Sequence, residues 1–360
     1  MTGTQLFTAN TPSVRVDGTE KGELARDLLR LDVCEDTAGL RTMVLRLTAV
    51  TPSVDAVGGD PAYLDGGVLD FGSSVTVDFG PPDRARQIFD GVVSAIELCL
   101  VDGDLPHVAV YAEDALMGLR MTRRSRTYEN VSDADIAAQL ASDHGLRADT
   151  AADGPTYPVV QQYNQSDLAF LRDRAAQVQA EVWVEDGRLQ FATRPHRQAG
   201  EVTLVYGNEL LSGHLRADLA HQRSSVTVCG FDLDAKDSIE ERADDSVIRA
   251  EITDGRIGPD VLTDALGEHA TVRTREVPTT ADQARAWAEA EMRRRGRAFV
   301  VADGVTAGTP ELTVGTLLRL DRVGTPFSGP GYYTTWVRHS FDPATGSRTR
   351  FRAERATVTS

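Results

Sequence analysis

The first third of the chain alternates apolar and polar positions with a period of two, as half-buried β-strands do. In residues 42–47 the alternating apolar side chains are Met43, Leu45 and Leu47, which would share one face of a strand. Turn-forming residues separate successive segments of this kind, and such punctuation favours a β-barrel or β-sandwich. The strands predicted in this way are Ser13–Val16, Leu28–Cys34, Thr42–Val50, Ser74–Phe79, Val92–Val101 and His107–Ala112.

From about residue 123 to residue 195 the apolar spacing becomes mixed. Ser132 and Ser166 each precede a run with helical spacing, and a serine hydroxyl can accept a hydrogen bond from a free backbone N–H of the first helical turn. Further on, Asp186-Gly187 lies between two apolar runs. This dipeptide accepts the positive dihedral angles of a tight turn and predicts a β-hairpin. We therefore predict an α/β region here.

After residue 199 the pattern returns to short β-type runs, Val202–Tyr206 and Ser225–Cys229. A weakly periodic acidic stretch and a helix expected over about residues 280–297 follow, and further strands come after them. We therefore expect a second β unit that an insertion divides. The predicted domains are a first β-barrel at 1–122, an intermediate α/β domain at 123–198, a second β-barrel at 199–231 and 298–360, and an inserted acidic segment with its helix at 232–297.

Composition limits the possible functions. The 360 residues suffice for two or three domains, and the formal net charge is −16. So acidic a chain lacks the basic surface that nonspecific binding to duplex DNA requires. The sequence has no apolar run as long as a bilayer span, and its first residues lack the pattern of a signal peptide. We expect a protein made and assembled in the cytoplasm, without membrane insertion.

The histidines form no recognisable metal or catalytic motif. His214 and His221 are seven residues apart with no third ligand nearby, and the His-Glu-x-x-His pattern is absent. His339 precedes Ser340, but the Gly-x-Ser-x-Gly motif of serine hydrolases does not occur. We predict polar surface or turn positions for the first two histidines and no serine hydrolase.

One acidic segment only partly matches a calcium-binding loop. Asp232 and Asp234 have a suitable spacing, but Asp237 stands where the loop needs glycine and Ala243 stands where it needs glutamate. A solvated acidic turn is the better interpretation.

The cysteines and the one basic cluster are also assigned structural roles. Cys34, Cys99 and Cys229 lack Cys-x-x-Cys spacing, and we predict small buried hydrophobic residues instead of disulfides or a zinc site. The arginines of residues 120–126 are expected on a solvated strand edge or on an ion-pair surface between subunits.

Several motifs occur in an order typical of one family. First come two β-type runs joined by a turn, and then a Tyr-Glu-Asn segment that leads into a capped helix. A Tyr-Asn dipeptide precedes a second capped helix, and the last motifs are strands joined by glycine turns. These motifs are Asp102–Pro106, Thr127–Asn130, Ser132, Gln161–Leu171, Gly308–Leu320, Gly331-Tyr332-Tyr333 and His339-Ser340-Phe341. From about Val14 to Arg355 the chain resembles the phage late control gene D family, the hub proteins of contractile-tail baseplates, and the hub portion of VgrG proteins.

The resemblance implies an α+β, β-rich fold with two related β-barrel hub domains, an intermediate α/β region and an inserted segment, and it makes His339 part of a strand. It further implies a homotrimer that joins a hexameric inner tube to a trimeric spike. The implied partners are other copies of the chain, the inner tube protein, the spike protein and other baseplate proteins. Translocated cargo or DNA in the lumen is an open alternative.

The same resemblance implies a component of a phage tail or injection particle. It implies no catalytic residues, no cofactor and no metal ion. Two alternatives stay open: a VgrG-like secretion hub that carries an effector, and a tail-associated cell-wall hydrolase, for which no residue constellation was found.

Overall fold

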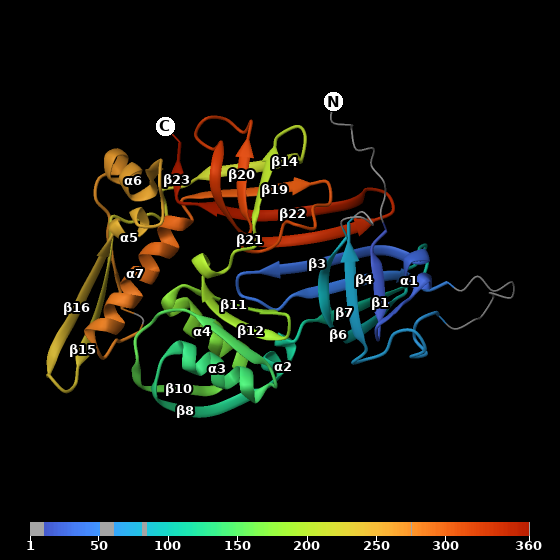
Figure 1. The fold of residues 1–360 in the computed structure, drawn as a ribbon, viewed down its shortest axis with the longest axis horizontal. Helices are drawn as coiled ribbons and strands as arrows, with labels where there is room; N and C mark the ends of the chain where they lie inside the picture. The colour runs from blue at the N-terminus through green and yellow to red at the C-terminus, as the bar shows by residue number, and fades with distance from the viewer. Residues whose placement is uncertain (1–10, 51–60, 81–84, 275, 360) are drawn as a thin grey trace.

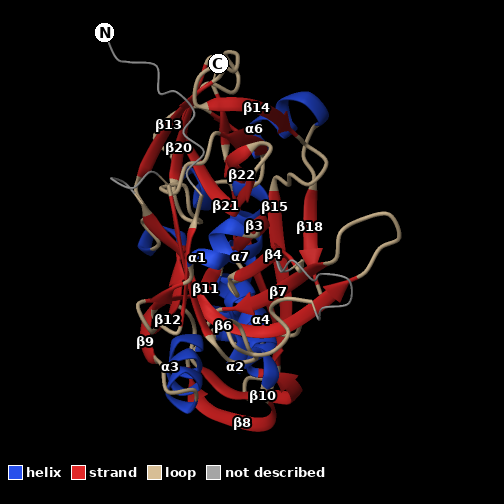
Figure 2. Ribbon diagram, turned by 90° about the vertical axis from the view of Figure 1, so that its right-hand side faces the viewer, coloured by secondary structure: helices blue, strands red, loops and turns tan. Residues whose placement is uncertain are grey.

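The computed structural model describes residues 11–50, 61–80, 85–274 and 276–359. The fold is α+β and β-rich, with two related β modules of barrel type, an intermediate α/β region and an inserted segment. In Figure 1 the insertion lies at the left and the first module at the right, with the α/β region and the second module between them. Figure 2 shows the α/β region and the second module at opposite ends of the molecule.

The first module is built as the alternating pattern predicts. Its apolar positions Met43, Leu45 and Leu47 are 1%, 0% and 0% exposed, and they form one core with Val77 and Phe89. The elements are β1 (Ser13–Val16), β2 (Thr19–Glu20), α1 (Gly22–Arg26), β3 (Leu28–Asp36), β4 (Thr42–Thr48), β5 (Ser74–Phe79), β6 (Arg86–Cys99) and β7 (His107–Glu113).

The α/β region follows from its local capping and turn signals. The Ser132 hydroxyl accepts a hydrogen bond from the Asp135 amide in a capping box, and the Ser166 hydroxyl accepts one from the Ala169 amide. The predicted hairpin is present, with Asp186 at a φ of 49°. The elements are α2 (Leu116–Met121), β8 (Arg123–Val131), α3 (Asp133–Asp143), β9 (Arg147–Ala151), β10 (Tyr157–Ser166), α4 (Asp167–Val178), β11 (Ala180–Glu185), β12 (Arg188–Thr193) and η1 (Arg194–His196).

The second module is divided by the insertion, which enters between its second and third strands. The core of the module includes Val300, Leu318, Tyr332 and Phe351. The strands are β13 (Glu201–Val205), β14 (Leu210–Ala217), β19 (Val300–Thr306), β20 (Leu317–Asp321), β21 (Gly329–Asp342), β22 (Gly346–Arg355) and β23 (Thr357–Val358).

The insertion contains more regular structure than its weak periodicity indicates. Strand β15, which the sequence placed in the second β unit, pairs with β16 and β18 instead. Val226 and Val228 of β15 lie in one core with Trp287 of α7. The elements are β15 (Ser225–Asp232), β16 (Asp237–Asp244), α5 (Ser246–Arg249), β17 (Arg256–Ile257), α6 (Gly258–Leu266), β18 (Ala270–Arg273) and α7 (Ala281–Arg297).

The two modules share one strand order. Apart from the two-residue strands β2 and β23, six strands of each module can be compared. In chain order they are β1, β3, β4, β5, β6 and β7 in the first module, and β13, β14, β19, β20, β21 and β22 in the second. In each module the first strand pairs with the fourth, the fourth with the fifth, the fifth with the sixth, the sixth with the third, and the third with the second. The modules differ in that β1 and β5 are antiparallel whereas β13 and β20 are parallel.

Irregularities of the pairing recur at matching places. A bulge places Ser94 as an extra residue of β6 against β7, and a bulge places Thr335 as an extra residue of β21 against β22. The Ser94 hydroxyl donates to the Tyr111 carbonyl at 3.3 Å, and the Thr335 hydroxyl donates to the Arg352 carbonyl at the same distance. Strands β3 and β14 are likewise both bulged near their N-terminal ends. Because a bulge marks one defined position in a strand pair, residues of β6 and β7 can be matched to residues of β21 and β22.

Strand β21 also joins the modules into one sheet of 13 strands. Its N-terminal half pairs with β20, and its C-terminal half, Trp336–Phe341, pairs antiparallel with β3 of the first module. The Arg338 Nε donates to the Asp32 carboxylate at 2.8 Å across this boundary. The modules are therefore coupled by backbone hydrogen bonds and by charge.

Candidate assembly surfaces

A buried ionic cluster holds the two modules and the α/β region together. Arg197 contacts Glu35 of β3 at 2.6 Å and Glu181 of β11 at 3.0 Å, and its guanidinium lies 4.2 Å from the ring centroid of Trp183. The Tyr333 hydroxyl of β21 donates to Glu181 at 2.9 Å. All three charged groups are less than 9% exposed. One arginine thus neutralises carboxylates from two parts of the fold, and we call this the Arg197 cluster.

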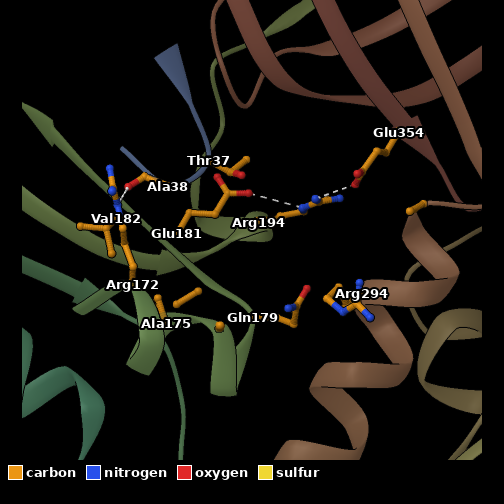
Figure 3. Close-up of a pocket in the computed structure, with 13 residues that line it drawn as sticks. Thr37, Ala38, Arg172, Ala175, Gln179, Glu181, Val182, Arg194, Arg294 and Glu354 are labelled. Atoms are coloured by element: carbon orange, nitrogen blue, oxygen red, sulfur yellow. Dashed lines mark hydrogen bonds and ion pairs between the residues drawn. The ribbon is translucent and has the colours of Figure 1, made fainter. Parts of the chain in front are cut away.

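A cavity of about 320 Å³ lies next to the Arg197 cluster (Figure 3). Its arginines are engaged by the protein itself. Arg194 contacts Glu354 at 2.8 Å, Arg172 donates to the backbone carbonyl of Ala38 at 2.7 Å, and Arg294 contacts Glu291 at 2.7 Å. Because these arginines already have partners within the chain, they are poorly available to bind a ligand in the cavity. The residues that line the cavity instead connect helices and strands of the fold.

Gly39 in the β3–β4 hairpin provides a close approach between the first module and β11. Its φ is +69°, and a Cβ there would overlap the Val182 carbonyl oxygen and the Leu116 side chain. We expect Gly39→Ala to lower the free energy of unfolding by about 2–3 kcal/mol, since backbone strain and steric overlap add. Gly187→Ala is the matched control, with a φ of +68° and no atom within 4 Å. Denaturant unfolding of both variants checks this, and equal losses would contradict a packing role for Gly39.

The histidines singled out in the sequence do not come together at one site. His214 on β14 and His221 beyond it are exposed. His339 is buried in β21, with its ring centroid 5.4 Å from that of Phe79 in the first module. Burial, and secondarily the nearby Arg41 guanidinium, lowers the pKa of His339 to about 3. His339 is therefore a neutral packing residue of the boundary between the modules.

The basic cluster of residues 120–126 lies on α2 and on the largely solvated strand β8, and several of its arginines form ion pairs within the chain. Arg120 contacts Glu113 at 2.6 Å, and Arg126 contacts Asp143 at 2.8 Å. Arg124 contacts Asp167, whose side chain is fully buried, at 2.8 Å. The cluster therefore helps to fasten β8 to helices α3 and α4, and α2 to β7.

The other sequence candidates also have structural surroundings. Asp232 accepts hydrogen bonds from the Asp234 and Ala235 amides in an exposed turn. The three cysteines are free but half-buried, so the expectation that they are buried is wrong. Among the residues that the structure describes, no three His, Cys, Asp or Glu side chains are grouped so that they could hold a metal ion. In the same part of the chain, no helix is long and apolar enough to cross a membrane.

Two strand edges are exposed at positions where their counterparts are buried. On β6, Glu97 and Leu98 beyond the bulge are exposed, whereas the matching half of β21 is mostly buried against β3. Strand β14 is exposed at six of its eight residues, whereas its counterpart β3 has five buried positions of nine. Exposed edges of this kind are natural sites for pairing with another chain.

The sequence matches the family described as the Alg8 N-terminal domain over residues 62–342, and no curated protein matches it.

Solved structures with the same fold include two tail proteins and a secretion component. The 43 kDa tail protein of prophage MuSo2 from Shewanella oneidensis has a TM-score of 0.71 and 16% identity, with 96% of this chain and 98% of that chain covered. A tail protein from Neisseria meningitidis MC58 has a TM-score of 0.63 and 13% identity, covering 96% of each chain. A type VI secretion component from E. coli, described as similar to T4 bacteriophage tail proteins, has a TM-score of 0.56 and 13% identity, covering 95% of this chain and 76% of that one.

Proposed function

The chain belongs to the Alg8 N-terminal domain family, and we propose that it acts as a structural baseplate hub of a contractile phage tail or of a phage-tail-like injection particle. The fold it shares with the two tail proteins and with the secretion component supports this role. We further propose that it is a hub of the late control gene D type, made in the cytoplasm and assembled into the particle.

The observation that carries the proposal is the pair of modules with one strand order and matching bulges. Three copies of such a chain supply six similar modules. A closed ring of three therefore presents sixfold-like contacts to a hexameric inner tube while keeping threefold contacts for a trimeric spike. Closure of this kind needs head-to-tail interfaces, in which different surfaces of neighbouring copies meet. The protein then serves as a symmetry adaptor, with the tube, spike and other baseplate proteins as partners.

A second candidate is a secretion hub that carries an effector, which the fold shared with the E. coli type VI component favours. Cargo that co-purifies with the assembled particle would distinguish this role. Both roles are structural and need no chemistry by this chain. Turnover of cell-wall substrate by the purified protein would contradict both and would support a tail-associated hydrolase.

The proposal predicts the mass of the assembly. Co-expressed with the inner tube and spike proteins of its particle, the full chain should form particles that contain three copies of its 39.0 kDa polypeptide. Light scattering gives the mass, and stoichiometry from stained gels gives the ratio to the partners. A chain that stays monomeric alone and binds neither partner would overturn the proposal.

A further inference from the structure

We propose that the exposed edge of β6 in one copy pairs antiparallel with the exposed edge of β14 in the next copy, in the register that β21 and β3 adopt within the chain. This inference rests on the proposed ring and specifies how its copies join. The partner is thus a second copy of this chain, and the interface repeats an existing one.

One pair of strands joins the two modules within the chain, and the strands that correspond to this pair do not bind each other there. Within the chain, the fifth strand of the second module (β21) binds the second strand of the first module (β3). The fifth strand of the first module is β6 and the second strand of the second module is β14. Each has a neighbour along its other edge, β7 and β19 respectively. A β6–β14 contact between copies would therefore continue the alternation of modules around a ring.

The exposure of apolar residues on these edges agrees with an interface. Leu98 near the end of β6 and Leu100 just beyond it are 37% and 68% exposed, and Leu211 on β14 is 40% exposed. Apolar side chains on an open strand edge are a hazard for uncontrolled pairing unless another chain covers them. A neighbouring copy would cover both groups at once.

The bulges fix which residues would meet. Ser94 of β6 corresponds to Thr335 of β21, since each donates its hydroxyl to the facing strand at the bulge. The acceptors, Tyr111 and Arg352, are therefore equivalent as well. Counting from Ser94 makes Cys99 the counterpart of Ser340.

The same counting works for the other strand. Tyr111 pairs with Val44, and Val44 pairs with Asp32 of β3. Arg352 pairs with Asp303, and Asp303 pairs with His214 of β14. His214 is therefore the counterpart of Asp32.

The register within the chain then gives the contacts between copies. Arg338 faces Cys34, His339 faces Val33 and Ser340 faces Asp32. The corresponding pairs between copies are Glu97 with Arg216, Leu98 with Leu215 and Cys99 with His214.

These pairs are chemically complementary. The first is a pair of opposite charges and the second is a pair of apolar side chains, both of which stabilise antiparallel strands when directly opposed. Within the single chain neither charge is fully paired. Glu97 accepts a hydrogen bond from the Tyr111 hydroxyl at 2.6 Å. Arg216 lies 3.6 Å from Asp218, and 64% of its side chain is exposed. Both remain accessible to a partner.

Disulfide trapping tests the register directly. Directly opposed residues of antiparallel strands lie about 4.5–5.5 Å apart, within the Cα separation that a disulfide tolerates. His214→Cys should therefore cross-link to the native Cys99 of the next copy under mild oxidation, giving ladders up to a trimer on non-reducing gels. His214→Cys combined with Cys99→Ser should lose the ladder, and Leu215→Cys, which points to the other face of the sheet, should not form it.

Light scattering of the same samples separates the two levels of the proposal. A trimer without the Cys99-dependent cross-link would overturn the β6–β14 register and leave the hub proposal intact. A chain that fails to assemble at all, alone or with tube and spike proteins, would overturn both.

Charge reversal gives an independent test. Glu97→Arg or Arg216→Glu alone should move the midpoint of ring dissociation to a several-fold higher protein concentration, since like charges would oppose each other. The double variant Glu97→Arg/Arg216→Glu should restore the original midpoint. Glu240→Arg, on exposed β16, is the matched control and should leave it unchanged. A double variant no better than the single ones would overturn the assigned pair.

Discussion

Replacement of Arg197 by methionine is expected to lower the free energy of unfolding by about 3 kcal/mol, the lower end of what breaking a buried ion pair costs, because the carboxylates that remain are only partly compensated by other arginines. Here two carboxylates, Glu35 and Glu181, lose their shared cation. Glu35 keeps Arg41 at 2.9 Å and Glu181 keeps Arg194 at 3.4 Å. Both glutamates are buried, at 8% and 5% exposure. Glu35 lies in the first module and Glu181 lies in the α/β region. The loss of stability should therefore appear first as a loosened contact between these two parts of the fold.

Denaturant unfolding followed by tryptophan fluorescence measures the effect, since Trp183 lies against the Arg197 guanidinium. Arg352→Met is the matched control. Arg352 pairs with Asp303 at 2.9 Å, but both side chains are about half exposed, and surface pairs of this kind contribute about 0–1 kcal/mol. Equal losses in the two variants would contradict the role assigned to the Arg197 cluster.

A charge-neutral version of the cluster separates ionic from packing effects. In the double variant Arg197→Met/Glu181→Gln one positive and one negative charge are removed together, while Glu35 keeps Arg41 at 2.9 Å and Arg194 keeps Glu354 at 2.8 Å. Part of the lost stability should therefore return. If the double variant is less stable than Arg197→Met alone, the charge of Glu181 does not carry the destabilisation and the explanation fails.

The local features of the fold could be predicted because their causes are close in sequence. Ser132 and Asp135 form a capping box over three residues, and Asp186-Gly187 fixes its hairpin within two. The alternation at Met43 and Leu45 likewise reflects a single strand. Such signals depend on neighbours that a reader of the sequence can see together.

The Arg197 cluster could not be predicted, because its members come from distant parts of the chain. Glu35 and Arg197 are separated by 162 positions, and neither belongs to a recognisable motif. The basic cluster illustrates the same limit. Its arginines were visible, but their partners Asp143 and Asp167 are identified only once the α3 and α4 helices pack beside β8.

The pairing of the modules was predicted from a family resemblance, and its basis in the sequence is weak. The insertion between β14 and β19 separates strands that are consecutive in the first module. The matching hydroxyls, Ser94 and Thr335, are different residues in different surroundings, and only the bulge geometry relates them. The division of the chain at the residues given for each domain stays a prediction.

His339 should make the boundary between the modules sensitive to acid. Its pKa in the folded chain is lowered to about 3, first by burial and then by Arg41, against about 6.5 in an unfolded chain. As pH falls below 6.5 the unfolded chain takes up a proton that the folded chain refuses. The stability associated with neutral His339 is therefore complete above pH 6.5 and is lost as pH falls toward 3, by about 1.4 kcal/mol per pH unit.

Asp114 acts in the opposite direction and would mask this effect in the unmodified protein. Burial raises the pKa of Asp114 to about 6, above its value of about 3.9 in an unfolded chain. Between these values the folded chain holds a proton that the unfolded chain releases. Stability from this group is therefore present below pH 4 and declines as pH rises to 6.

The two effects separate when each variant is compared with the unmodified protein over pH 6 to 4. The stability of the unmodified protein minus that of His339→Asn should fall by about 1.4 kcal/mol per pH unit on acidification. Asparagine cannot ionise there and can keep a hydrogen bond to the Thr349 hydroxyl, which lies 3.0 Å from His339 Nδ1. The corresponding difference for Asp114→Asn should rise over the same interval. Urea titrations at several pH values measure both, and a difference for His339→Asn that does not change with pH would show that this histidine does not govern the acid response of the module boundary.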